Sequence, residues 1–220
     1  MKKFIHESVL EDIELESINV NGKRLYVTPD GKKYPSITTV LSNYNKKSIY
    51  EWRKRVGEQE ANKISTKASR RGTKVHKLCE DYLNNEKNIF EGYTPDNIEM
   101  FKSIQNILDD IEIVYTQETT LFSHHLKTAG RVDCVGKFRG KKCIIDFKTS
   151  SKPKKKEWID NYFMQGSGYS VMWEEMTGIP ISNIAIIIAV DQNEPQVFME
   201  KRDNWIDKFI ELRNEFDFDF

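Results

Sequence analysis

The sequence predicts an α/β fold in which helices cover a mixed central sheet. In the first half of the chain, apolar residues recur at helical spacing, and from Ile111 onward they alternate as they do in strands. The run 184–190 is entirely apolar, which is typical of a strand buried on both faces. A sheet of such strands has two apolar faces, and helices have to cover them.

The first half of the chain is expected to form a hairpin followed by helices. Residues 23–34 are predicted to be a hairpin whose turn is Pro29-Asp30-Gly31. Helices are predicted over residues 48–64, 67–84 and 95–110, and Pro95 favours the start of the last one. The apolar face of the middle helix is formed by Val75, Leu78, Cys79, Tyr82 and Leu83.

The remaining elements follow in the order β-β-β-α-β. Strands are predicted over residues 113–122, 130–138 and 141–149, and then a helix over 155–176, which Gly178 and Pro180 end. The strand 184–190, a short strand 196–200 and a helix 204–216 complete the chain. We expect a single domain, in which residues 1–112 form an N-terminal hairpin and helical region and residues 113–220 form the α/β core.

The composition restricts the class of protein. A chain of 220 residues with 38% apolar residues suits one soluble domain. The three cysteines lack C-x-x-C spacing, so neither a zinc site nor an iron–sulfur cluster is predicted. No apolar run approaches the roughly 20 residues that a membrane helix needs, and no membrane partner is expected. The N-terminal residues resemble neither a secretory nor a transit signal, and the chain is short; we therefore expect a cytoplasmic protein of a bacterium or a phage-infected cell.

Basic residues are concentrated in two runs although the net charge is zero. Between positions 46 and 74, ten basic residues stand against three acidic ones, and between 137 and 156, nine stand against Asp146 alone. Such runs indicate either faces that follow a phosphate backbone or ordinary solvated helix faces, and the sequence supports both interpretations equally. Tyr44, Tyr50 and Trp52 would either stack on bases or belong to the core.

The segment 130–150 carries the most chemical information. If Arg139-Gly140 form a two-residue hairpin turn, Asp133 lies directly across from Asp146. Because side chains alternate along a strand, Asp133, Asp146 and Lys148 then share one face. The opposite face would belong to the core, and it carries Val132, Cys134, Phe138, Cys143, Ile145 and Phe147.

Two opposed carboxylates and a lysine on one sheet face predict a metal-dependent hydrolytic site. Cβ atoms of opposed residues are about 5 Å apart, and carboxylates that close have to share a proton or a cation. Carboxylate oxygens suit Mg²⁺ or Mn²⁺, which also accept phosphate oxygens. The ammonium group of Lys148 can orient the attacking water and stabilise charge on the phosphate. The predicted chemistry is phosphodiester hydrolysis, and ordinary solvent-facing charges are the alternative.

The motifs of the chain resemble those of a known enzyme family. They are, in chain order, a P-S-I-T-T segment (35–39), a basic helix with Trp52, a G-x-x-x-H helix (Gly72 to His76, with Glu80), Glu118 before the core hairpin, the strands G-R-V-D (130–133) and D-F-K (146–148), and a Q-x-x-x-Y helix (Gln165 and Tyr169). Together they are similar to the RecB-like branch of the PD-(D/E)xK nuclease superfamily, above all to the mitochondrial genome maintenance exonucleases and their phage and bacterial relatives. The resemblance covers residues 34–190 and implies a restriction-endonuclease-like core.

The resemblance implies a metal site and a catalytic lysine. His76, Asp133, Asp146 and the backbone carbonyl of Phe147 would hold Mg²⁺ or Mn²⁺, and Lys148 would be the catalytic lysine. Without the resemblance, a lone histidine beside an apolar helix face is more often structural. Glu118 would either join the metal ligands or pair with Arg131, and the two roles are equally supported.

The resemblance also implies a substrate. Residues expected to contact DNA are Gln165, Tyr169, Arg71, Lys74, Arg131, Ser36, Thr38 and Trp52. The implied activity is that of a DNA exonuclease, on a single strand threaded under a helical arch, in replication, repair or recombination. Some relatives carry an iron–sulfur cluster held by four cysteines, which this chain lacks.

Other functions remain open at this stage. They are a double-strand-specific exonuclease, a structure-specific endonuclease, and a non-catalytic nucleic-acid-binding module. The C-terminal tail 214–220, which alternates Phe and Asp, either docks on a replication or repair protein or forms a final edge strand.

Overall fold

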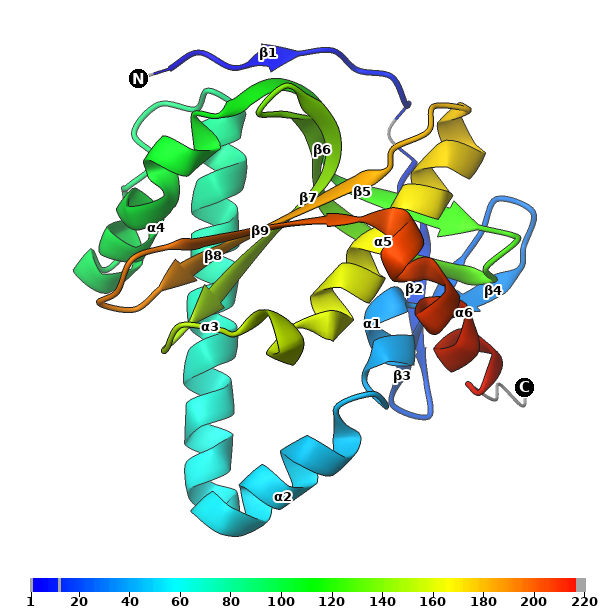
Figure 1. Ribbon diagram of the computed structural model, residues 1–220, viewed down its shortest axis with the longest axis horizontal. Coiled ribbons are helices and arrows are strands. Elements are labelled where there is room, and N and C mark those ends of the chain that lie inside the picture. Colours follow the sequence, from blue (N-terminus) through cyan, green and yellow to red (C-terminus); the bar gives the residue numbers. More distant parts are fainter. Residues whose placement is uncertain (1, 12, 217–220) are drawn as a thin grey trace.

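A six-stranded mixed sheet runs through the centre of the protein (Figure 1). The computed structural model describes residues 2–11 and 13–216. The strand order is β1-β5-β6-β7-β8-β9, with parallel pairing of β1 to β5 and of β7 to β8 and antiparallel pairing elsewhere. The strands are β1 (Ile5–His6), β5 (Ile111–Ser123), β6 (Thr128–Phe138), β7 (Lys141–Ser150), β8 (Asn183–Val190) and β9 (Gln196–Lys201). The predicted mixed sheet is confirmed, except that β1 is too short to give a periodic signal.

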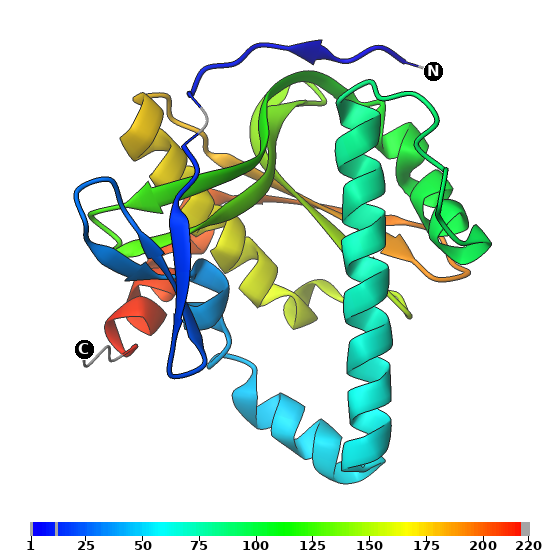
Figure 2. The ribbon, with the colours of Figure 1, turned by 180° about the vertical axis from the view of Figure 1, so that it is seen from behind.

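Helices cover both faces of this sheet (Figures 1 and 2). One face packs against α3 (Glu58–Leu83) and α4 (Pro95–Leu108), and the other against α5 (Asp160–Thr177) and α6 (Ile206–Asn214). The predicted core face is confirmed for Cys134, Phe138, Cys143, Ile145 and Phe147, which pack toward α3 and α4. It is wrong for Val132, which packs with α5 on the opposite face. Val132 and Cys134 thus pack on opposite faces of the sheet, so the regular alternation of side chains along β6 is interrupted at Asp133.

The hairpin of β6 and β7 has the predicted turn. Arg139 and Gly140 both have positive φ, 48° and 77°, as a type I′ turn requires. Phe138 therefore pairs with Lys141, and the predicted register holds as far as Cys134 and Ile145. Beyond this pair, β6 continues beside β5, and β7 continues beside β8. The two strands thus separate at the residues that carry the predicted carboxylates.

A second, three-stranded sheet lies beside the first. It contains β2 (Glu16–Val20), β3 (Lys23–Val27) and β4 (Lys33–Pro35), and α1 (Ile37–Leu41) follows it. The predicted hairpin of β3 and β4 is confirmed. The prediction omits β2, although Asn21-Gly22, with φ of 54° and 76°, is a strong signal for a two-residue hairpin turn. Ser36 joins the two sheets, because it bridges to Ala129 of β6.

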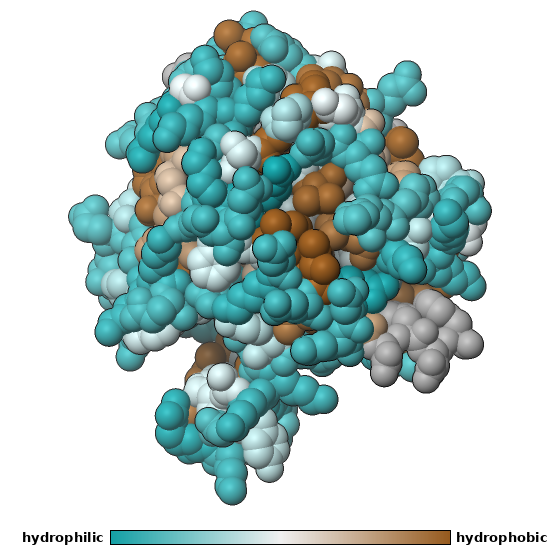
Figure 3. Space-filling view, turned by 45° about the vertical axis from the view of Figure 1, so that its right-hand side comes forward, coloured by the Kyte–Doolittle hydropathy of each residue, from teal (hydrophilic) through white to brown (hydrophobic). Residues whose placement is uncertain are grey.

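The N-terminal helices break at a different residue from the one predicted. The helix α2 (Lys46–Val56) ends at Gly57, whose φ is 86°, and α3 then runs without interruption for 26 residues. The predicted boundary near residue 65 is wrong, because glycine alone adopts this backbone conformation without strain. Among the described residues, α2 has none that is buried. Its junction with α3 projects from the body as a separate, mostly polar lobe (Figures 1 and 3).

The helix α5 lies unusually close to the layers on either side of it. A Cβ atom on Gly166 would come within 2.5 Å of the Ile184 side chain of β8, and one on Gly168 within 2.5 Å of the Ile37 side chain of α1. Glycine at both positions therefore lets α5 approach the sheet and α1 together. The helix ends at Gly178 in the left-handed conformation, as predicted.

Two findings concern partners outside the fold. Within the described residues, no helix is both long enough and apolar enough to cross a lipid bilayer. Residues 217–220, which hold most of the predicted docking tail, lie outside the described residues.

Candidate active site

Three potential metal ligands come together from three separate elements. His76 lies on α3, Glu118 on β5 and Asp133 on β6, and one ligand atom of each lies within 4.8 Å of the other two. The Nδ1 atom of His76 is 3.5 Å from Oδ2 of Asp133. These side chains line a depression of about 470 Å³, whose other walls are Gly72, Thr73, Lys77, Glu80 and Arg131.

Asp133 lies at the point where β6 and β7 separate. Its Oδ2 atom accepts a 2.8 Å hydrogen bond from the backbone N–H of Phe147. The carboxylate thus takes the place of a strand–strand hydrogen bond and is held between the two strands. Phe147 presents its N–H to the site in this way, whereas the predicted role of its carbonyl as a metal ligand remains a prediction.

Asp146 and Lys148 form a buried ion pair on β7. Only 2% of Asp146 is exposed, and both of its carboxylate oxygens lie 2.5 Å from Nζ of Lys148. The ring of Tyr162, on α5, lies 5.1 Å from the same nitrogen. Burial raises the pKa of Asp146 to about 6, and Asp133 adds to this increase, whereas Lys148 opposes it. Tyr162 was not among the predicted residues, although it precedes Gln165 by one helical turn.

Glu118 adopts a backbone conformation that glutamate rarely takes. Its φ is 51°, in the left-handed region, between Gln117 and Thr119, which both pair with β6. This conformation directs the carboxylate toward Asp133. Burial raises the pKa of Glu118 to about 7, with further contributions from Asp133 and Glu80, while Arg131 and Lys77 lower it. Glu118 was predicted either to be a metal ligand or to pair with Arg131. Its place in the group of three potential ligands favours the metal-ligand role, while Arg131 acts on it only through its charge.

This donor set fits a hard divalent cation. Two carboxylates and an imidazole converge in a partly buried depression, and burial together with the neighbouring Asp133 raises the pKa of Glu118. Among the described residues, Oδ2 of Asp146 is also buried without a hydrogen bond of good geometry. Oxygen-rich sites with one imidazole suit Mg²⁺ and Mn²⁺. Asp146 is not in the group of three, and it faces Lys148 in this structure.

Tyr169 has a different environment from the one predicted. It is 2% exposed, and its hydroxyl donates a 2.7 Å hydrogen bond to the backbone carbonyl of Arg131. A Cβ atom on Gly130 would lie 2.8 Å from this hydroxyl, so only glycine fits beneath it. The ring is enclosed by α5 and β6 in this structure, and the expected contact of Tyr169 with substrate remains a prediction. The partly exposed Gln165 remains accessible.

Ser36 is likewise a structural residue. It is fully buried, and its Oγ accepts a hydrogen bond from the backbone N–H of Thr39, so it caps α1. The expected contact of Ser36 with DNA remains a prediction. Thr38 is exposed and accepts a hydrogen bond from Arg24, and Trp52 is partly exposed on α2.

Basic side chains extend from the site along α3. Lys74 is exposed, with Nζ 5.2 Å from the Tyr93 ring, and Arg71 lies 3.8 Å from Asp191. They border a hollow of about 690 Å³, whose other basic walls are Lys63, Lys67 and Arg70. The Nε atom of Arg71 is buried and has no hydrogen-bond partner among the described residues.

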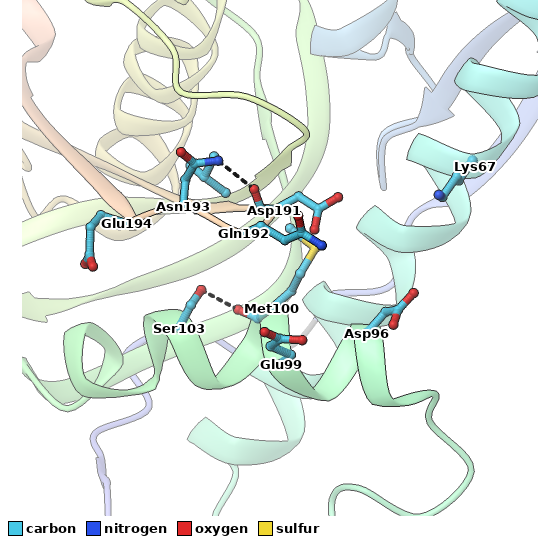
Figure 4. Close-up of a pocket in the computed structure, with 10 residues that line it drawn as sticks. Lys67, Asp96, Glu99, Met100, Ser103, Asp191, Gln192, Asn193 and Glu194 are labelled. Atoms are coloured by element: carbon cyan, nitrogen blue, oxygen red, sulfur yellow. Dashed lines mark hydrogen bonds between the residues drawn. The ribbon is translucent and has the colours of Figure 1, made fainter.

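The neighbouring hollow has the opposite charge (Figure 4). It lies between α4 and the loop that joins β8 to β9, and its acidic walls are Asp96, Glu99, Asp191 and Glu194. Lys67 of α3 reaches its edge. An acidic surface repels phosphate, so this hollow is unsuited to a nucleic acid.

No family model matches the chain. The chain is similar to mitochondrial genome maintenance exonuclease 1. Identity is 33% over 128 residues with the Mus musculus protein, 30% over 136 with the Homo sapiens protein and 33% over 132 with the Xenopus tropicalis protein. Each match covers 54% of this chain but only 37–38% of the relative.

The similarity to mitochondrial genome maintenance exonuclease 1 supports one prediction and overturns another. The expected resemblance to that group is confirmed. The expected cytoplasmic setting in a bacterium or a phage-infected cell is wrong, because these relatives are vertebrate proteins named for the mitochondrial genome. That expectation depended on the lack of a recognisable N-terminal signal and on the chain length.

Proposed function

We propose that this chain is a Mg²⁺- or Mn²⁺-dependent exonuclease with a PD-(D/E)xK core, which hydrolyses single-stranded DNA from an end during replication, repair or recombination. The observation that carries the proposal is the convergence of His76, Glu118 and Asp133 beside the Asp146–Lys148 pair, at the point where β6 and β7 separate. Relatives named as exonucleases support the same activity.

The proposed metal ligands are His76, Glu118 and Asp133, with Asp146 and the Phe147 carbonyl completing the set. Bound there, Mg²⁺ or Mn²⁺ would polarise a phosphate oxygen and lower the pKa of a water molecule. The Phe147 N–H holds the Asp133 carboxylate in one orientation, so this ligand is ordered before the cation binds.

Lys148 is the proposed catalytic lysine. Its ammonium group, held by Asp146 and by the Tyr162 ring, can orient the attacking water and stabilise negative charge on the phosphate. The pKa of Lys148 is raised, chiefly by Asp146 and Asp133, although burial opposes this, so the side chain stays charged. Lys148 thus acts as an electrostatic group, and the proton of the attacking water goes to solvent or to a carboxylate.

The proposed DNA path follows the basic side of α3. Residues 1–112 would supply the hairpin and the projecting helical arch, and residues 113–220 would supply the nuclease core of one domain. Arg71, Lys74 and Arg131 would contact phosphates near the metal ligands, and Trp52 and Gln165 would contact the strand. The acidic hollow of Figure 4 bounds this path.

The direct test is digestion of end-labelled single-stranded DNA in manganese buffer, read at nucleotide resolution. We expect a ladder that shortens from one end and disappears in EDTA. Duplex DNA degraded faster than the single strand would favour a double-strand-specific exonuclease, and a circle cut as fast as a linear strand would favour an endonuclease. DNA binding without any cleavage would identify a non-catalytic binding module and refute the proposal.

The proposed protein partner is tested separately. Deleting residues 217–220, which leaves the buried Phe216 in place, should leave cleavage intact and remove retention of a replication or repair protein on the immobilised chain. Unchanged retention would dispose of the docking role of the tail.

A further inference from the structure

An exposed tryptophan follows the strand that carries the proposed catalytic lysine, and it takes no part in the functions described so far. Trp158 is 59% exposed, whereas the other described tryptophans are buried or partly buried. It ends the short 3-10 helix Lys156–Trp158, between β7 and α5. The ring of Tyr162 lies 5.1 Å from Nζ of Lys148, and Tyr162 follows Trp158 by four residues, so the Cα atoms of Trp158 and Tyr162 are at most about 14 Å apart.

The segment that carries Trp158 is held firmly on the sheet. The backbone of Lys154 makes two hydrogen bonds with the Gln196 side chain of β9, of 2.7 and 2.9 Å. Lys156 forms an ion pair with Glu200 of the same strand. Ile159, which directly follows Trp158, is 1% exposed in the core. The indole therefore sits on an ordered support, where little conformational entropy is lost when a flat ligand binds.

The surroundings of Trp158 are basic. Lys152, Lys154 and Lys155 have no ion-pair partner among the described residues, and Nζ of Lys155 lies 5.3 Å from the centre of the indole ring. In both ribbon views the segment lies on the side of the sheet toward which α2 projects (Figures 1 and 2). An exposed aromatic ring among unpaired lysines is the arrangement with which proteins bind single strands: rings stack on bases, and lysines follow phosphates.

We infer that Trp158 forms a base-stacking subsite for a nucleotide next to the scissile phosphate, with Lys152, Lys154 and Lys155 on the flanking phosphates. The ligand is an unpaired stretch of polynucleotide, because a base in a duplex has both of its faces covered. The inference rests on the proposed function and adds to it a residue that places the strand relative to Lys148. Stacking tolerates all four bases, so the subsite would bind without sequence preference.

The test measures binding in EDTA, where cleavage is absent. The ligands are a fluorescent oligothymidylate of about 12 nucleotides and an abasic oligonucleotide of equal length. W158A should bind oligothymidylate roughly five- to a hundredfold more weakly than the unmodified protein, whereas W158F should retain most of the affinity. Ile5→Ala, at a side chain with the same 59% exposure on β1, is the matched control and should bind normally.

The abasic ligand separates stacking from charge. It should bind the unmodified protein about as weakly as W158A binds oligothymidylate, and W158A should lose little further affinity for it. Equal binding of oligothymidylate by W158A and the unmodified protein overturns the inference. It does so also if W158A dissociates a self-associated form of the protein, because Trp158 would then belong to a contact between copies. If the unmodified protein binds oligothymidylate in this way but cleaves no DNA in manganese buffer, the nuclease proposal is refuted and the stacking subsite is retained. Absence of all oligonucleotide binding overturns both.

Discussion

Asp133 accepts a hydrogen bond of 2.8 Å from the backbone N–H of Phe147, across the gap that opens between β6 and β7. One carboxylate therefore both joins two strands and belongs to the group of three potential metal ligands. The two roles can be separated by substitution, because an amide oxygen can still accept from the N–H but is a poor ligand for a hard cation.

Asp133→Asn should fold and lose the metal. Mn²⁺ should raise the melting temperature of the unmodified protein and should no longer raise that of the variant, because ligand binding stabilises only the folded state. Differential scanning fluorimetry over a Mn²⁺ series measures both. Asp110→Asn, at an acid on the surface paired with Arg139, is the control and should keep the full response. A full response of Asp133→Asn to Mn²⁺ would contradict the ligand role.

Lys148→Ala should lower the cleavage rate by at least about a hundredfold while DNA binding is retained, because it removes charge stabilisation at the phosphate. The buried Asp146 then loses its partner, and its pKa should rise further above about 6. Single-turnover cleavage and binding in EDTA distinguish the two effects. Lys142→Ala, at an exposed lysine of the same strand, should cleave normally. Retained turnover in Lys148→Ala would remove this residue from the chemistry.

Glu118→Gln should stabilise the metal-free protein at alkaline pH. The pKa of Glu118 is raised from 4.5 to about 7, so the folded state holds a proton that the unfolded state releases between these values. The free energy of unfolding therefore falls as the pH rises through this window. The variant lacks this loss. The difference in free energy of unfolding, variant minus unmodified protein, should therefore be about 1 kcal/mol larger at pH 8 than at pH 5.

Urea unfolding at the two pH values, without metal, measures the Glu118 effect. Saturating Mn²⁺ should reverse the order of stability at pH 8, because the variant lacks one proposed ligand. A difference that does not change with pH would show that the carboxylate is not held in a proton-binding environment.

Tyr169→Phe should weaken the site without touching the substrate. Loss of the hydrogen bond from the buried Tyr169 hydroxyl to the Arg131 carbonyl should cost about 1–2 kcal/mol of stability. The rate constant kcat should fall while KM stays nearly constant, because the hydroxyl fixes β6 rather than DNA. Thermal unfolding and steady-state kinetics test this together. A large rise in KM with normal stability would support the predicted substrate contact.

Local signals were sufficient where one turn or one period determines the structure. Arg139-Gly140 fixes the register of β6 and β7 as far as Cys134 and Ile145, whereas Asp133 lies beyond the paired residues and accepts from the Phe147 N–H instead. The same kind of signal at Asn21-Gly22 defines β2, so that strand was predictable from the sequence. The apolar run of β8 was equally direct evidence for a buried strand.

Other features depend on tertiary contacts that the sequence does not display. An isolated glycine in a charged helical segment is often tolerated, so Gly57 did not mark the break between α2 and α3. Glutamate has no intrinsic preference for the left-handed conformation of Glu118. The spacing of Gln165 and Tyr169 shows that they share a helix face, but only the glycine at position 130 of the neighbouring strand shows that Tyr169 is enclosed.

One unbroken rod connects the projecting lobe to the metal-ligand group. The helix α3 begins at the Gly57 junction and carries His76 eighteen residues later, or about 27 Å along its axis. A force on the lobe would act on a lever whose other arm holds the imidazole of His76. Either α3 would bend or the imidazole would move relative to Glu118 and Asp133.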